Sequence, residues 1–505
     1  MRRTTLYTLF FLVGFCALKW ARHYTLSYSF NDMYAFLQMS VSWLDGRPFL
    51  YDNIWGYHHR IHNYYTVLLW APFIRLGGAY GLFAAQTGLL LLAVGLVAGR
   101  LARDQFPAWV QWSLVAGLML GPVSLWLNDH PNIGWHTELT YLPLALLFAL
   151  ALTTEKRGYA WLAGVLVVLV KEDGAILAAL IYLAWLALDT LSRHPETPLA
   201  TVLHSRRFWG AVVGWALMFG LGMGWLAVKN EAGEPRLKNT LAILSQSGAS
   251  TTFAWAMARL VGQSLLLLAG VITYLGVLTR PLAASSRQTV WIIFGVGVGV
   301  ITVLNVVQSS FYYGQPAFAL VALTWPPRFV LVWAFALAFC VLYLLSDVYR
   351  VPQPWNLTPV VLFIITLVVG QLVLCYQVRP DLPTGADLKN LLRLRPAADK
   401  QIALLQPADL AMLRRLARLL PPHSSVFAFD YAVPVFHKHY EIWPTGKQFK
   451  PADVAIIPAN DFQGLTRTSG MPPTYRAFPA GAYVLYAAPE FEPYIRAALA
   501  TPGTP

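Results

Sequence analysis

Long apolar runs recur along most of the chain and are separated by short polar connections. A membrane-spanning helix needs about 20 consecutive apolar residues, whereas a buried strand needs only about 4–8. The pattern therefore predicts about eleven membrane helices, several of them shorter than a full span. The runs cover residues 4–20, 80–100, 109–127, 139–153, 159–170, 176–191, 208–228, 260–278, 290–307, 329–345 and 359–376.

Composition supports a membrane protein. The 505 residues are 57% hydrophobic and only 12% charged, against about 25% charged in soluble proteins. The net charge of +13 comes without a dense Lys/Arg run or a nucleic-acid motif. It therefore indicates membrane topology and contact with membrane lipids, and no nucleic-acid partner is expected. Cys16, Cys340 and Cys375 lie in apolar runs without metal or disulfide spacing and are interpreted as small buried hydrophobes.

Basic residues gather in alternate connections, which predicts an orientation. The positive-inside rule places these connections and the N-terminus on the cytoplasmic side of the membrane, which is expected to be a bacterial plasma (inner) membrane. The first apolar run lacks a small-residue cleavage site and is expected to remain as a helix. An odd number of spans puts the C-terminus outside, and an extra span at the proline-broken residues 311–327 would reverse that. The basic residues are Arg2, Arg3, Arg100, Arg103, Lys156, Arg157, Arg193, Arg206, Arg207, Arg280, Arg287 and Arg350.

The composition changes after residue 376. Amphipathic helical patterns and short strand-like runs replace the long apolar segments. The expected fold is an all-α polytopic membrane bundle at residues 1–376, followed at 377–505 by a small α/β soluble domain, placed outside the membrane. The predicted helices are 387–394, 408–420 and 491–499, and the predicted strands are 425–430, 454–458 and 482–487.

The outer loop at residues 21–78 carries the first candidate chemistry. Asp32 and Gln38 lie in a weakly amphipathic segment, expected to be a helix on the outer membrane surface. Arg60 and His62 precede a short apolar run, interpreted as a second interfacial helix. A carboxylate can deprotonate a hydroxyl or bind a divalent cation, and Arg and His can neutralise a phosphate. Alternatively, these side chains simply face water.

Two further polar groups interrupt the apolar runs. His136 and Glu138 are two residues apart at the start of a predicted span, a spacing that does not fit one helix face and indicates a metal site only weakly. A helix cap and ordinary loop polarity are the alternatives. Lys171, Glu172 and Asp173 form three successive charges in an otherwise apolar stretch. They are consistent with a solvated turn, an internal ion pair or a phosphate-facing site.

The order of these motifs resembles a family of prokaryotic polytopic membrane proteins of unknown function. That family has an Asp-x5-Gln helix, a His ten residues before a Pro, a His-x-Glu motif and a Lys-Glu-Asp triplet. The match covers roughly residues 30–190 and, weakly, an aromatic pair at 312 and 313. The chain departs from the pattern at Trp135 and Thr137, and its pair is Tyr-Tyr where His-Tyr is usual.

The layout of that family is similar to the GT-C glycosyltransferases. The resemblance implies a membrane glycosyltransferase that moves a sugar from a polyprenyl-phosphate-linked donor to an acceptor on the outer face. Asp32 would be the catalytic base, with a divalent cation as a possible cofactor and no metal ligands assigned. A transporter or flippase of a lipid-linked or anionic substrate, or a non-catalytic membrane scaffold, remains as an alternative. The implied substrate-binding residues are Gln38, Arg60, His62, His136, Glu138, Lys171, Glu172, Asp173, Tyr312 and Tyr313.

Overall fold

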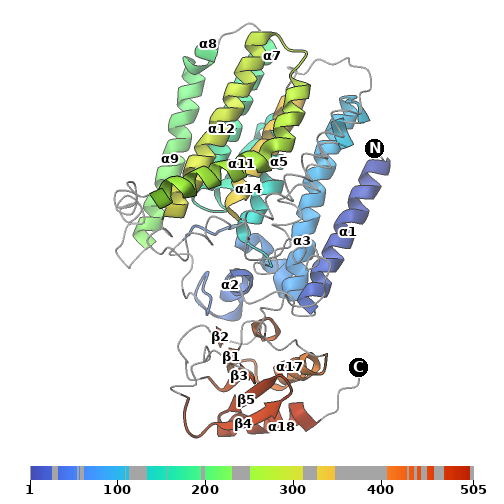
Figure 1. Cartoon of the computed structure of the whole chain (residues 1–505), viewed down its shortest axis with the longest axis vertical. Helices are drawn as coiled ribbons and strands as arrows, with labels where there is room; N and C mark the ends of the chain where they lie inside the picture. Colours follow the sequence, from blue (N-terminus) through green and yellow to red (C-terminus); the bar gives the residue numbers. More distant parts are fainter. Residues whose placement is uncertain are drawn as a thin grey trace.

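The chain folds into a helical bundle with a small α/β unit at one end (Figure 1). A computed structural model describes residues 2–24, 32–53, 56, 62–108, 110–112, 134–154, 156–194, 199–229, 251–310, 327–346, 407–428, 432–436, 441–444, 452–459 and 471–500.

Nine of the eleven predicted spans coincide with a helix of the bundle. The other two, 109–127 and 359–376, lie almost wholly outside the described residues, so the count of eleven is not confirmed. Among the residues that the structure describes, four helices are long and apolar enough to cross a membrane: α3, α7, α9 and residues 284–305 of α12. The bundle consists of α1 (Arg2–Tyr24), α3 (Val67–Arg103), η4 (Thr137–Thr140), α5 (Tyr141–Leu152), α6 (Arg157–Val168), α7 (Gly174–Arg193), α8 (Leu199–Leu203), α9 (Arg206–Lys229), α11 (Thr251–Leu278), α12 (Ala284–Ser310) and α14 (Pro327–Leu345).

Helix α14 forms the centre of the bundle. Its side chains from 329 to 344 are all buried, as expected for a helix that is apolar on every face. It runs antiparallel to α12, because Phe294 packs against Phe339 at 5.3 Å while Gly297, further along α12, lies against the earlier Phe335. Helix α12 therefore ends, and α14 begins, at the same end of the bundle. Residues 311–326 between them lie outside the described residues.

Helix α3 bends sharply near its start. Gly78 has φ 57° and ψ −137°, a conformation that favours glycine and separates a short first helix from the long span. Three residues later, Gly81 has no Cβ where the Phe73 carbonyl approaches closely. The predicted short helix before the span, with Pro72 inside it, is thus confirmed as a separate piece.

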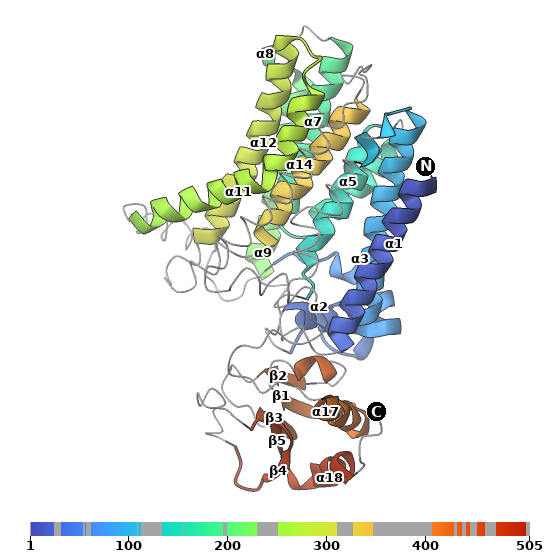
Figure 2. The ribbon, with the colours of Figure 1, turned by 45° about the vertical axis from the view of Figure 1, so that its right-hand side comes forward.

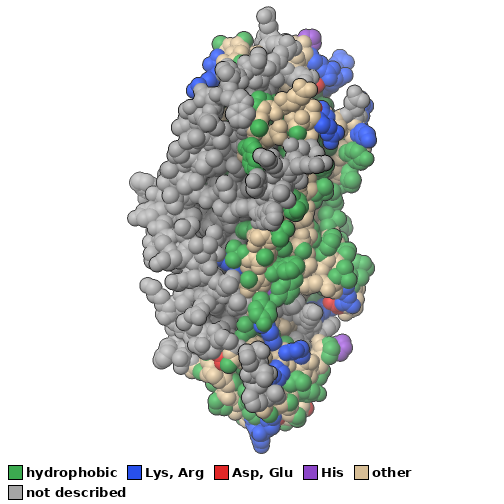
Figure 3. Space-filling model, turned by 90° about the vertical axis from the view of Figure 1, so that its right-hand side faces the viewer, with side chains coloured by type: hydrophobic (Ala, Val, Ile, Leu, Met, Phe, Trp, Pro, Cys, Tyr) green, Lys and Arg blue, Asp and Glu red, His purple; other side chains and the backbone are tan. Residues whose placement is uncertain are grey.

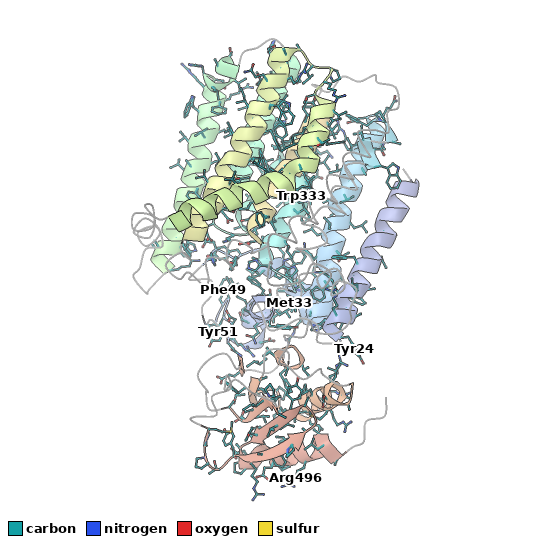
Figure 4. All side chains as sticks on the ribbon, in the orientation of Figure 1. Tyr24, Met33, Phe49, Tyr51, Trp333 and Arg496 are labelled. Carbon is teal, nitrogen blue, oxygen red and sulfur yellow. The ribbon has the colours of Figure 1, made fainter. Side chains whose placement is uncertain are left out.

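Helix α2 (Asp32–Val41) is confirmed as a helix, but its expected exposed face is wrong. Every side chain from Met33 to Ser40 is buried, including Gln38. The weak amphipathic pattern failed because protein segments, rather than water, surround Gln38 and Ser40. Figure 1 places α2 between the base of the bundle and the α/β unit, and Figure 4 labels Met33 there.

The α/β unit contains a five-stranded sheet in the order β2-β1-β3-β5-β4. The first three strands are parallel, whereas β5 pairs antiparallel with both β3 and β4. Helices α17 and α18 pack on one face of the sheet (Figure 2). The predicted strands and two of the three helices are confirmed to within about two residues, and the helix expected at 387–394 lies outside the described residues. The elements are α17 (Pro407–Leu419), β1 (Ser425–Ala428), β2 (Glu441–Pro444), β3 (Val454–Pro458), β4 (Arg476–Ala480), β5 (Tyr483–Ala487) and α18 (Glu492–Ala500).

The α/β unit contacts the bundle at the end of α1. The Arg414 guanidinium of α17 lies 3.6 Å from the centre of the Tyr24 ring and donates a hydrogen bond to the Tyr24 carbonyl. Tyr24 lies at this junction in Figure 4. In Figure 3, the described Lys and Arg side chains gather toward the two ends of the molecule, with mainly apolar surface between them, as expected for a protein that crosses a bilayer.

Candidate functional site

Three segments that are far apart in the sequence meet at one end of the bundle. They are the connection before α3, the η4 turn before α5 and the turn between α6 and α7. The backbone N–H groups of Tyr65 and Thr66 both donate to the Leu169 carbonyl, at 3.1 and 3.0 Å. Charged side chains from separate predicted motifs thereby become neighbours.

Lys171 lies at the centre of this ionic cluster. Its ammonium is 2.5 Å from Glu138 Oε1 and 3.5 Å from Asp173 Oδ2, and the Tyr141 hydroxyl donates to the other Asp173 oxygen. Burial alone would lower the pKa of Lys171, but the Glu138, Asp173 and Glu172 carboxylates outweigh it, and the pKa lies above its ordinary value. Lys171 is therefore a buried charged group that joins the starts of α5 and α7.

Glu172 points to a different partner. Its Oε1 lies 2.7 Å from His62 Nδ1, and its Oε2 accepts the backbone N–H of Asn63 at 3.2 Å. Burial alone would raise the pKa of Glu172, but His62 and Lys171 outweigh it, and the pKa lies below its ordinary value. An ionised carboxylate accepts hydrogen bonds and cannot donate them. His62 Nδ1 therefore carries a hydrogen, and Nε2 is the nitrogen that can gain or lose a proton.

His136 caps the η4 turn. Its Nδ1 accepts the backbone N–H of Glu138 at 3.4 Å and lies 3.7 Å from Glu138 Oε2. This geometry matches the helix-cap alternative left open by the sequence. Within the described part of the chain, no group of three or more His, Cys, Asp or Glu residues is arranged to hold a metal ion.

The middle of α2 lies against this cluster. The Phe36 ring packs edge-on against His136 at 5.0 Å and against Tyr64 at 5.1 Å. Asp32 is the first residue of α2. The side chain of Asp32 is not among those described. Gln38 does not contact the cluster in this way; its Oε1 accepts the backbone N–H of Asn53 at 2.9 Å and so joins α2 to the loop that follows it.

The structure thus brings together six of the predicted site residues: His62, His136, Glu138, Lys171, Glu172 and Asp173. Arg60, Tyr312 and Tyr313 lie outside the described residues.

Two groups of the site were not predicted from the sequence. Tyr141 is an ordinary residue of an apolar run by pattern, although its position three residues after Glu138 could have suggested a shared helix face. Lys229, at the end of α9, donates to Asn63 Oδ1 at 2.8 Å and to the Tyr65 hydroxyl at 3.0 Å. It is more than 160 residues from both partners, so no local spacing could have indicated these contacts.

The bundle and its buried ionic cluster define a helical membrane protein with a polar site at one end. A family model described as "Predicted membrane protein (DUF2079)" matches residues 22–467, and the chain belongs to this family. No curated protein matches the chain in sequence. Among solved structures, the chain is similar to ArnT from Cupriavidus metallidurans in the apo state, with a TM-score of 0.37 and 15% identity over 99% of this chain and 100% of that chain.

Proposed function

We propose that the protein is a membrane glycosyltransferase that moves a sugar from a polyprenyl-phosphate-linked donor to a hydroxyl acceptor on the outer face of the membrane. The observation that supports this proposal is the convergence of the His62, Glu138 and Lys171 segments beside Phe36 of α2. Buried ionisable groups in a membrane protein are costly, and they are typical of functional sites. Here carboxylates, an imidazole and an ammonium lie together beside the Phe36 ring.

The proposed reaction is a displacement at the anomeric carbon. Asp32 takes the proton of the acceptor hydroxyl as its oxygen attacks, and the bond from the anomeric carbon to the phosphate oxygen breaks. The phosphate leaves with the bonding electrons, and a protonated His62, oriented by Glu172, or Arg60 would balance its charge. Lys171 holds Glu138 and Asp173 in place. A divalent cation beside Asp32 is compatible with this scheme and is not required by it.

The proposed topology places the site and the α/β unit on the same, outer side. The unit contacts the Tyr24 end of α1, and the Lys19 ammonium of α1 lies 3.4 Å from the Gly134 carbonyl, two residues before His136. The basic residues Lys156, Arg157 and Arg193 lie at the ends of α5, α6 and α7 that are remote from the ionic cluster. The positive-inside rule assigns that far end to the cytoplasm.

The test is the Asp32→Asn variant. Purified full-length protein would be given a panel of polyprenyl-phosphate sugars, and the release of polyprenyl phosphate would be measured. Loss of a general base reduces turnover by about 10²–10⁴-fold, and we expect a fall in this range. Asp45→Asn is the matched control, since Asp45 lies in the same loop and pairs with the exposed Arg75. A folded Asp32→Asn protein with full turnover, or a wild type that uses no donor of the panel, would contradict the proposal.

A further inference from the structure

We propose that the end of α9 forms a binding site for a long-chain lipid phosphate, with the Lys229 ammonium at its phosphate and the exposed apolar face of α9 along its chain. The assignment of this lipid as the carrier of the sugar donor rests on the proposed function. The binding site itself rests on the contacts and exposure of α9.

Lys229 is held in place by the connection before α3. Its ammonium donates to Asn63 Oδ1 at 2.8 Å and to the Tyr65 hydroxyl at 3.0 Å, and it lies 5.0 Å from the centre of the Tyr65 ring. Trp225, one turn earlier on α9, donates its indole N–H to the same hydroxyl at 2.5 Å. A lysine that only anchors a helix extends toward water and lipid headgroups. This lysine is folded back over two aromatic rings instead.

The same connection links Lys229 to the ionic cluster. The Asn63 side chain joins α9, since its Nδ2 donates to the Gly222 carbonyl at 2.9 Å and its Oδ1 accepts from Lys229. The Asn63 backbone N–H donates to Glu172, which holds His62 at 2.7 Å. An anion at Lys229 would therefore be linked to His62 through two residues, Asn63 and Glu172.

Helix α9 presents an apolar stripe that leads to this ammonium. Among its described side chains only Leu226 is buried, and Figure 1 shows α9 at the outer edge of the bundle. Positions four apart along one face are 53–71% exposed, and no charge interrupts α9 between Arg207 and Lys229. The stripe is about 18 Å long at 1.5 Å per residue, enough to follow much of one lipid chain. It consists of Val213, Leu217, Leu221 and Trp225.

Charge complementarity identifies the headgroup. A lysine ammonium is a point charge that forms short, charge-assisted hydrogen bonds with phosphate oxygens. The Tyr65 hydroxyl accepts from both Lys229 and Trp225 and keeps its own hydrogen to donate to an anion, while the Trp225 ring adds an amphipathic edge suited to the membrane interface. A neutral lipid alcohol could accept a hydrogen bond from the ammonium but would lack the attraction between opposite charges. The site therefore selects for a phosphate on the end of a long apolar chain.

The experiment is native mass spectrometry of purified full-length protein in detergent, titrated with decaprenyl phosphate, decaprenol, phosphatidylglycerol or inorganic phosphate. We expect the wild type to bind decaprenyl phosphate in preference to the other three. The Lys229→Met variant should weaken that binding by at least about tenfold, because the charge-assisted contact is lost. Lys156→Met is the matched control, since Lys156 also lies over a tyrosine ring, that of Tyr159 at 5.6 Å.

A second variant tests the chain-binding stripe without touching Lys229. Leu221→Asn changes a side chain that is 71% exposed and should also weaken binding of decaprenyl phosphate. Undiminished binding in both variants would overturn the proposal, as would equal binding of phosphatidylglycerol, which would make Lys229 an interfacial anchor only. Lipid binding by a wild type that transfers no sugar would refute the proposed function and leave this site intact.

Discussion

At the scale of single residues, the buried Lys171 is the feature on which the site depends. Its ammonium is the positive member of an ionic cluster with two carboxylates, Glu138 and Asp173, each less than one-tenth exposed. Breaking a buried ion pair by removing one partner leaves an uncompensated charge, which costs far more than the pair contributes when it is intact.

Replacing Lys171 with Met should lower the free energy of unfolding by about 3–5 kcal/mol. The loss would be measured by thermal unfolding in detergent, followed through tryptophan fluorescence. Arg100→Gln is the control, because it breaks an exposed ion pair with Asp104 and should cost less than about 1 kcal/mol. Adding Glu138→Gln to Lys171→Met should recover part of the loss. Equal melting of the Lys171 and Arg100 variants would contradict the buried-charge interpretation.

The sequence indicated these residues but not their pairing. The triplet at 171–173 was recognisable because three charges interrupt an apolar run. The sequence left a solvated turn, an ion pair and a phosphate contact as alternatives. The partners Glu138 and His62 lie 33 and 110 residues away. The packing of α5 against α7 and against the connection before α3 brings these partners together. The spacing of residues within one segment carries no information on that packing. Asp32 remains a prediction, since its side chain is not described.

At the scale of elements, the bend of α3 sets the path of the chain into the site. The short helix before Gly78 folds back so that the Phe73 carbonyl approaches Gly81. A side chain at position 81 would have to push the two pieces apart. The long apolar runs were predictable because a membrane-spanning helix needs about 20 consecutive apolar residues, and such a run is visible in the sequence. The burial of α2 was not predictable, since Gln38 and Ser40 face protein rather than water.

The Gly81→Ala variant should be destabilised by about 2 kcal/mol or more, because its new Cβ overlaps backbone that cannot rotate away. Gly88→Ala is the matched control on the same helix, with nothing within 4 Å of the position. It should be neutral or stabilise the protein by up to about 1 kcal/mol, because glycine weakens a helix interior. Thermal unfolding of both proteins would decide the point. A Gly81 variant as stable as the Gly88 variant would show that the bend tolerates a side chain.

At the scale of the whole molecule, the two ends of the bundle differ in character. The ionic cluster, α2 and the α/β unit share one end, whereas the last turn of α7 with Arg193 reaches the other. The 20 residues of α7 span about 30 Å, the thickness of the hydrocarbon core.

The α/β architecture was predictable from its short strands, but its attachment to the bundle was not. The contact of Arg414 with Tyr24 joins residues 390 apart, and no feature of the sequence indicated it.

Cysteines placed at Arg476 and at Arg193 should react with a membrane-impermeant maleimide from opposite sides of the membrane. Both native side chains are 67% exposed, one on the sheet and one at the far end of α7. The variants would be made in a chain without Cys16, Cys340 and Cys375. We expect the residue at 476 to be labelled in intact cells and the residue at 193 only after permeabilisation. Labelling of both from one side would contradict the arrangement.

The ionic cluster also constrains how the sequence can change over evolutionary time. Glu138, Asp173 and Tyr141 each contact Lys171 or a carboxylate that Lys171 neutralises. An exchange of one member alone leaves a buried group whose charge or hydrogen bond is no longer balanced. We therefore expect the four positions to change together, so that a functional homologue either keeps all of them or replaces several at once.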